Sequence, residues 1–153
     1  KVLIADEPTS MLDVSLRIGI LKLLADIRNR SQIAVLLITH DLAIARHASE
    51  RVMVMYAGRI VESGPTATVL SAPNHPYTRL LLAAAPRLRP GRTRVRAPAR
   101  AQAIGDGCPF APRCSEQLPE CLQTRPRLAS AGVDHLSACL VNTRGATTDR
   151  GIY

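Results

Sequence analysis

The sequence predicts an α/β fold in which a parallel sheet is followed by a small, loop-rich cysteine module. Two continuous aliphatic runs, residues 2–5 and 33–39, have no polar face, as is typical of strands buried on both sides of a parallel sheet. Between them, residues 14–30 carry apolar side chains at helical spacing, and Asp13 stands where an N-cap belongs. Strand, helix and strand in this order indicate a right-handed crossover between parallel strands.

The elements expected after the second strand are shorter. Gly58 separates two runs of strand-forming residues and supplies the turn of a hairpin. Proline near the first turn opens each of the last two helices. The expected elements are a helix over 41–48, strands over 51–57 and 59–62, and helices over 65–71 and 76–85. No apolar run is long enough to cross a bilayer as a helix.

The composition changes after residue 85. The chain of 153 residues has 46% hydrophobic and 21% charged residues and a net charge of +8, which suits a globular body. Residues 86–107 hold six arginines and one acid, with proline and glycine between them, and so predict an extended linker. We therefore expect a body at 1–85, this linker, a cysteine module at 108–139 and a flexible tail at 140–153.

Two adjacent carboxylates, Asp6 and Glu7, follow the first aliphatic run. Four aliphatic residues that end in Asp-Glu resemble the Walker B element of a phosphate-binding ATPase. Ligands of open parallel sheets bind at the carboxyl ends of the strands, so the resemblance implies that both side chains face a bound nucleotide. Asp6 would hold Mg²⁺, directly or through water. Glu7 would accept a proton from the water that attacks a γ-phosphate, or orient that water. A solvated acidic turn is the alternative for a motif this short.

Two stretches, LIADEPTSMLD and LLITHDL, resemble the ATP-binding subunits of ABC transporters. The resemblance implies the C-terminal part of a P-loop ABC-type nucleotide-binding domain, with ATP and Mg²⁺ as ligands. It makes the first stretch a Walker B strand and a D-loop, in which Ser10, Leu12 and Asp13 contact a second subunit. It also makes His40 the switch histidine, whose imidazole can hydrogen-bond a γ-phosphate oxygen and the neighbouring acid. Met11 replaces the alanine that is usual in the family.

A later stretch, HPYTRLLLAAAP, narrows the resemblance to the ATPases of bacterial oligopeptide and dipeptide importers and their nickel-importing relatives. This implies a subunit that hydrolyses ATP to drive peptide import at the cytoplasmic face of the bacterial plasma membrane. Its partners would be a second ABC ATPase subunit, identical or homologous, two transmembrane permease subunits and, indirectly, an extracytoplasmic peptide-binding protein. No nucleic acid is expected as a partner. We expect Tyr56, Gly58, His75 and Tyr77 to serve packing.

The four cysteines all fall in the last third of the chain, at Cys108, Cys114, Cys121 and Cys139. Their spacing matches neither the short zinc-finger pattern nor the common ferredoxin pattern, so it does not choose a metal. A loop-rich segment of this length cannot build its own core, and thiolates on one ion or cluster would supply cross-links. The resemblance to peptide-importer ATPases implies a [4Fe–4S] cluster on all four. Zn²⁺, with His135 able to replace one thiolate, and disulfides are the alternatives.

Two motifs of the resembled family do not occur in this sequence: the phosphate loop Gly-x-x-x-x-Gly-Lys-[Ser/Thr] and the signature Leu-Ser-Gly-Gly-Gln. Because the chain also enters a strand directly at Lys1, we expect it to be the C-terminal half of a longer subunit and to be inactive alone. One alternative is a nucleic-acid ABC ATPase of the excision-repair kind, in which the arginines of 86–107 would neutralise phosphates. A non-catalytic truncated remnant is another.

Overall fold

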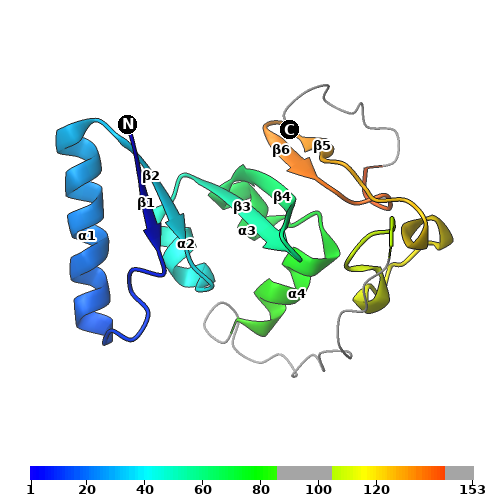
Figure 1. Ribbon diagram of the computed structural model, residues 1–153, viewed down its shortest axis with the longest axis horizontal. Helices are drawn as coiled ribbons and strands as arrows, with labels where there is room; N and C mark the ends of the chain where they lie inside the picture. Colours follow the sequence, from blue (N-terminus) through cyan, green and yellow to red (C-terminus); the bar gives the residue numbers. More distant parts are fainter. Residues whose placement is uncertain (86–104, 144–153) are drawn as a thin grey trace. The chain divides into compact units, whose positions relative to one another are not determined.

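The computed structural model describes residues 1–85 and 105–143, which fall into two compact units, Lys1–Ser49 and Glu50–Tyr153 (Figure 1). The predicted linker lies outside the described residues except for 105–107, and so does the predicted tail beyond residue 143. The division into body, linker, cysteine module and tail therefore stays a prediction. None of the described helices is long and apolar enough to span a membrane.

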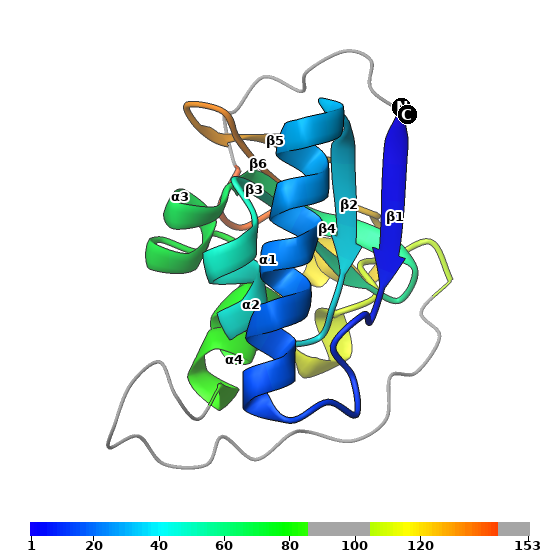
Figure 2. The same ribbon diagram turned by 90° about the vertical axis from the view of Figure 1, so that its left-hand side faces the viewer.

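The first unit is a strand, helix and strand crossover with one further helix, as predicted. β1 (Val2–Asp6) and β2 (Ala34–Ile38) pair in parallel, with Asp6 opposite Ile38. α1 (Val14–Ser31) connects the two strands and runs alongside them (Figure 2). α2 (Leu42–Ala48) follows β2.

Capping side chains decide where both helices begin. Asp13 Oδ1 accepts a hydrogen bond from the backbone N–H of Leu16 at 2.9 Å, which confirms the predicted N-cap of α1. Asp41 Oδ1 accepts from the backbone N–H of Ala43 at 2.8 Å and caps α2 in the same way. α1 ends where Gln32 adopts left-handed backbone at φ 48°.

Within this chain, one face of β1 and β2 is uncovered, in contrast to the predicted burial on both faces. Large side chains on one face stay exposed, by 66% at Val2, 63% at Ile4, 39% at Leu36 and 45% at Ile38. The parallel pairing is also limited to two strands within the described residues. An aliphatic run establishes that a strand is apolar, but not that a second layer of structure lies over each of its faces.

The second unit is built on a four-stranded antiparallel sheet in the order β3-β4-β6-β5. β3 (Arg51–Tyr56) and β4 (Arg59–Pro65) form the predicted hairpin, whose turn uses left-handed backbone at Gly58, with φ 75°. β6 (His135–Ser137) pairs with β4, and β5 (Ala129–Gly132) pairs with β6. The cysteine segment, expected to be loop-rich, thus adds two strands to the sheet of the hairpin.

An aromatic core joins the hairpin to the elements that follow it. These elements are α3 (Thr66–Ser71), α4 (Pro76–Ala84) and the 3₁₀ turns η1 (Ala111–Arg113) and η2 (Pro119–Leu122). The ring centroid of Tyr56 lies 4.6 Å from that of Tyr77 and 5.3 Å from that of Phe110. The packing role predicted for Tyr56 and Tyr77 is therefore confirmed.

Candidate functional site

The first candidate site lies at the carboxyl ends of β1 and β2. Glu7 follows β1 and His40 lies just beyond β2, and the parallel register brings both positions to the same edge. Glu7 Oε1 accepts a hydrogen bond from the backbone N–H of His40 at 3.0 Å and lies 2.7 Å from His40 Nδ1. Two residues that were predicted from different sequence motifs are thus in direct contact.

Glu7 and His40 line a pocket of about 120 Å³. The other residues that line it are Thr9, Ser10, Met11, Arg17, Thr39, Asp41 and Ile44. The side chain of His40 is 82% exposed and that of Glu7 is 34% exposed, so solvent reaches both groups. In the described part of the chain, Glu7 Oε2 makes no hydrogen bond and is open to a ligand or water.

Asp6 does not join this pocket. It is exposed, and the alternation of side chains along β1 puts it on the same face as Val2 and Ile4. The residues that line the pocket do not include it. The structure therefore brings Glu7 and His40 together but not Asp6, whose assignment to Mg²⁺ stays a prediction.

Ser10 and Asp13 shape the loop between β1 and α1. Ser10 donates to the carbonyl oxygen of Glu7 through both its backbone N–H, at 3.1 Å, and its hydroxyl, at 2.8 Å. Asp13 ends the loop as the N-cap of α1. Between them, Met11 has left-handed backbone at φ 66° and a fully exposed side chain. The predicted contact of this loop with a second subunit stays a prediction.

Arg17 is a pocket residue that sequence reasoning did not identify. Its Nε–H donates to the carbonyl oxygen of Leu12 at 2.8 Å, and its Nη1 lies 3.8 Å from Asp41 Oδ2. Helical side chains lean toward the N-terminus of their helix. A cation four residues after the N-cap is therefore placed to reach back over the preceding loop, and this signal could have been used.

The second candidate site is a cavity of about 10 Å³ among the cysteines. Cys108, Cys114, Cys121 and Cys139 all line it, and all four are free thiols. Burial raises the pKa of the Cys108 and Cys114 thiols above the ordinary value, and the neighbouring cysteines add to this. Within residues 1–85 and 105–143, no three His, Cys, Asp or Glu side chains are arranged to hold a metal ion. The thiols converge without forming a ready coordination sphere.

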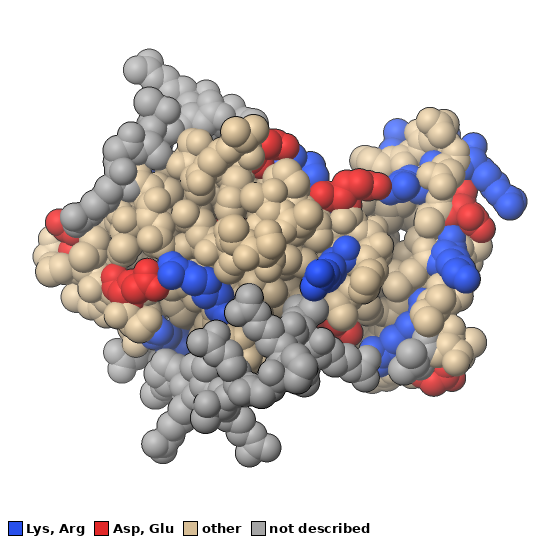
Figure 3. All heavy atoms as spheres, turned by 180° about the vertical axis from the view of Figure 1, so that it is seen from behind, with Lys and Arg blue, Asp and Glu red and all other residues tan. Residues whose placement is uncertain are grey.

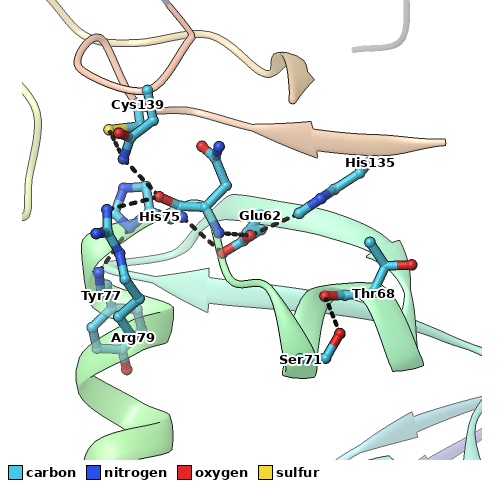
Figure 4. Close-up of polar contacts among 10 residues, drawn as sticks. Glu62, Thr68, Ser71, His75, Tyr77, Arg79, His135 and Cys139 are labelled. Atoms are coloured by element: carbon cyan, nitrogen blue, oxygen red, sulfur yellow. Dashed lines mark hydrogen bonds and ion pairs between the residues drawn. The ribbon is translucent and has the colours of Figure 1, made fainter. Parts of the chain in front are cut away.

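Glu62 of β4 is a fully buried carboxylate that contacts His75, a residue of the cavity lining (Figure 4). It accepts hydrogen bonds from the backbone N–H groups of Asn74 at 2.6 Å and His75 at 3.1 Å. Its Oε1 also lies 2.7 Å from His135 Nε2. A carboxylate without access to water needs such partners, because its desolvation is otherwise uncompensated. Glu62 therefore ties β4 to the start of α4 and to β6.

Both histidines near the cysteines have partners other than a metal. His75 lines the cavity, but its Nδ1 accepts a hydrogen bond from the backbone N–H of Tyr77 at 3.1 Å and so caps α4. Burial lowers the pKa of His75 to about 4, against the opposing charge of Glu62, so its ring is neutral at pH 7. His135 pairs with Glu62 and does not line the cavity. The structure therefore does not place His135 where it could replace a thiolate.

Comparison with known proteins gives both units the same relatives. A family model described as "Oligopeptide/dipeptide transporter, C-terminal region" matches residues 61–121. The dipeptide transport ATP-binding protein DppF of Haemophilus influenzae is 39% identical over 143 residues, which cover 90% of this chain and 44% of that protein. The chain is therefore similar to peptide ABC transporter ATP-binding proteins. Since nine-tenths of the chain is aligned, the similarity extends well into the first unit.

Further relatives carry similar names. DppF of Escherichia coli K12 is 40% identical over 143 residues, which cover 90% of this chain and 42% of that protein. A putative peptide import ATP-binding protein of Brucella ovis, BOV_A0348, is 42% identical over 149 residues, which cover 91% of this chain and 44% of that protein. The chain thus spans less than half the length of the curated relatives it matches.

These relatives do not favour the nucleic-acid alternative, because their names refer to peptide transport. The arginines at positions 87–100, which suggested that alternative, lie outside the described residues. On the face drawn in Figure 3, described Asp and Glu side chains lie among the Lys and Arg side chains.

Proposed function

We propose that this chain is the C-terminal part of an ATP-hydrolysing subunit that powers peptide import through an ABC transporter. The observation that carries the proposal is the contact between Glu7 and His40 at the carboxyl ends of two parallel strands. Ligands of parallel sheets bind at this edge, and the pocket of about 120 Å³ opens there. The relatives, named as dipeptide transport and peptide import ATP-binding proteins, support the same function.

In this proposal Glu7 acts on the attacking water. The backbone N–H of His40 holds Oε1 of Glu7 and fixes the carboxylate, while Oε2 stays open to orient that water or take its proton. The ring nitrogen of His40 that faces away from Glu7, Nε2, would donate to a γ-phosphate oxygen of ATP when the imidazole carries a proton on both nitrogens. Asp6 would hold Mg²⁺, and Ser10 and Asp13 would contact the opposing subunit as a D-loop.

The proposal extends to the assembly in which the subunit works. The fold would be that of a P-loop ABC-type nucleotide-binding domain, completed by segments outside this chain. It would pair with a second ABC ATPase subunit, identical or homologous, beneath two transmembrane permease subunits. An extracytoplasmic peptide-binding protein would deliver the peptide, and the ATPase would lie at the cytoplasmic face of the bacterial plasma membrane.

The test is a Glu7→Gln substitution in the full-length protein that contains this chain. An amide cannot accept the proton, so we expect kcat for ATP to fall by about 100-fold or more, while ATP binding is kept. Asp26→Asn, which neutralises an exposed carboxylate of α1, is the matched control and should leave turnover unchanged. Turnover that survives Glu7→Gln would contradict the role of Glu7. An unmodified protein that hydrolyses no ATP beside its permease partners would contradict the function.

We also propose that Cys108, Cys114, Cys121 and Cys139 hold a [4Fe–4S] cluster, with Zn²⁺ as the alternative. The support is that four free thiols share one cavity and that His75 and His135 have other partners, which leaves an all-thiol donor set. A cavity of about 10 Å³ has room for only about one water molecule, so the thiols would have to move apart around a cluster.

Metal analysis of the protein purified without oxygen tests this assignment. Equal amounts of iron and acid-labile sulfide, lost together in a Cys121→Ser variant, would support the cluster. Stoichiometric zinc would support the alternative. Protein that contains neither metal, and whose four thiols all react with a maleimide after mild unfolding, would contradict a metal site.

A further inference from the structure

Arg17 bridges the two segments that carry the candidate catalytic residues. Its Nε–H donates to the carbonyl oxygen of Leu12, at 2.8 Å, in the loop that follows Glu7. Its Nη1 lies 3.8 Å from Oδ2 of Asp41, the residue directly after His40. One side chain of α1 therefore contacts both the loop between β1 and α1 and the segment that leaves β2.

The carboxylate of Asp41, which Arg17 contacts, is itself held in place by hydrogen bonds. Asp41 Oδ1 accepts hydrogen bonds from the backbone N–H groups of Ala43, at 2.8 Å, and Ile44, at 3.4 Å, because Asp41 is the N-cap of α2. Its second oxygen is the one that faces Arg17. Since the cap fixes the carboxylate, the guanidinium is located relative to the start of α2.

The loop between β1 and α1 contains strained backbone, so contacts that hold it in place matter. Glu7 has φ 45° and Met11 has φ 66°, left-handed values that are unfavourable for side chains of these kinds. Within the loop, the bonds from Ser10 to the carbonyl of Glu7 close one turn. The Leu12 carbonyl lies beyond that turn, and Arg17 gives it a charge-assisted partner.

We propose that Arg17 is a positioning residue that keeps residues 9–13 in register with His40 and Asp41. A shift of either segment is then transmitted to the other through the guanidinium. The inference rests on the proposed ATP hydrolysis, because one of the two coupled segments follows the proposed catalytic residue Glu7 and the other contains the proposed switch histidine, His40. The bond to Leu12 holds the loop to α1, while the half-exposed and longer ion pair with Asp41 is the weaker contact and limits the coupling.

Hydrogen exchange on the full-length protein tests the positioning role directly. In Arg17→Gln, we expect backbone amides of residues 9–13 to exchange about three- to tenfold faster, because the loop loses its charge-assisted bond. Amides of residues 20–30 in α1 should keep their rates, which separates a local effect from general destabilisation. Arg30 is an exposed arginine of the same helix, so Arg30→Gln is the matched control. It should leave the exchange rates of both groups of amides unchanged.

Two further variants sharpen the test. Arg17→Lys keeps the charge and an N–H donor group but loses the planar guanidinium, so it should restore part of the loop's protection. Asp41→Asn keeps the cap of α2 but loses the ion pair, so its effect on residues 9–13 should be smaller than that of Arg17→Gln. Equal loop exchange in Arg17→Gln and unmodified protein would overturn the positioning role.

Steady-state kinetics then connect the loop to the reaction. A positioning role predicts that Arg17→Gln lowers kcat for ATP by about tenfold while KM changes less than twofold, since the side chain acts through the loop. Faster loop exchange with unchanged kcat would overturn the coupling to catalysis. Absence of ATP turnover in the unmodified protein would contradict the proposed function itself, and the exchange result would still report whether Arg17 holds the loop.

Discussion

Two glutamate–histidine pairs in this molecule have the same separation and opposite surroundings. Glu7 Oε1 lies 2.7 Å from His40 Nδ1 in the first unit, and Glu62 Oε1 lies 2.7 Å from His135 Nε2 in the second. The first pair has side chains that are 34% and 82% exposed, whereas those of the second are 0% and 5% exposed. Burial, rather than distance, therefore distinguishes a pair that a ligand can reach from one that supports the fold.

The other hydrogen-bond partners of the two glutamates also differ between the buried and the exposed pair. Glu62 uses its oxygens on two backbone N–H groups as well as on His135, so β4, α4 and β6 all depend on it. In Glu7, Oε1 contacts His40 and Oε2 stays open. A buried carboxylate must be fully paired, while a carboxylate at a pocket can keep an oxygen for chemistry. Substitutions in the two pairs should therefore differ in kind.

The largest effect is expected from Glu62→Ala. Its removal leaves His135 and two backbone N–H groups buried without an acceptor, so the free energy of unfolding of the second unit should fall by about 3–5 kcal/mol. The chain has no tryptophan and its three tyrosines follow residue 50, so tyrosine fluorescence during urea denaturation reports this unit. Glu62→Gln, which keeps the shape and one acceptor, should cost less. A loss below about 1 kcal/mol for Glu62→Ala would contradict the assigned structural role.

The next effect is a loss of stability in acid that depends on His75. Its pKa is lowered from 6.5 to about 4 in the folded protein, so the unfolded chain binds the extra proton first as the pH falls. The free energy of unfolding should decrease between about pH 6.5 and pH 4, by up to about 3 kcal/mol, and this contribution should not change further below pH 4.

His75→Gln is the control for this acid effect, measured by the same urea denaturation at a series of pH values on metal-free protein. The variant should lose stability at pH 7, because the buried ring is gone. Its pH profile should be flatter than that of the unmodified chain between about pH 6.5 and pH 4. Parallel profiles would show that the proton uptake belongs to other groups.

A smaller effect is expected at the N-cap of α1. Asp13→Ala removes the acceptor of the Leu16 N–H, so the first unit should lose about 1 kcal/mol. Hydrogen exchange should be faster in the first turn of α1 and unchanged in the second unit. Asp13→Asn should restore the cap. Asp26→Ala, at an exposed position in the same helix, is the comparison that shows whether loss of charge alone has an effect.

The smallest effect on stability is expected from His40→Ala. The pair with Glu7 is as short as the buried pair, but solvent screens it, so the free energy of unfolding should change by less than about 0.5 kcal/mol. In the full-length protein the same variant should lose ATP turnover. A destabilisation comparable to that of Glu62→Ala would remove the distinction between the two pairs.

Sequence reasoning succeeded where the signal is local. The crossover of β1, α1 and β2 follows from apolar periodicity, the start of α1 from Asp13, and the hairpin turn from Gly58. Glu7 and His40 could be paired in advance because each follows a strand of the same parallel sheet. Capping, turns and periodicity depend on neighbours within a few residues, so one chain segment contains the information.

Other features required the tertiary structure. The sequence by itself could not determine that β6 would pair with β4, that Glu62 would meet His135, or that Arg17 would bridge Leu12 and Asp41. Burial and long-range pairing depend on which distant segment packs against a residue, and neither spacing nor composition specifies that partner.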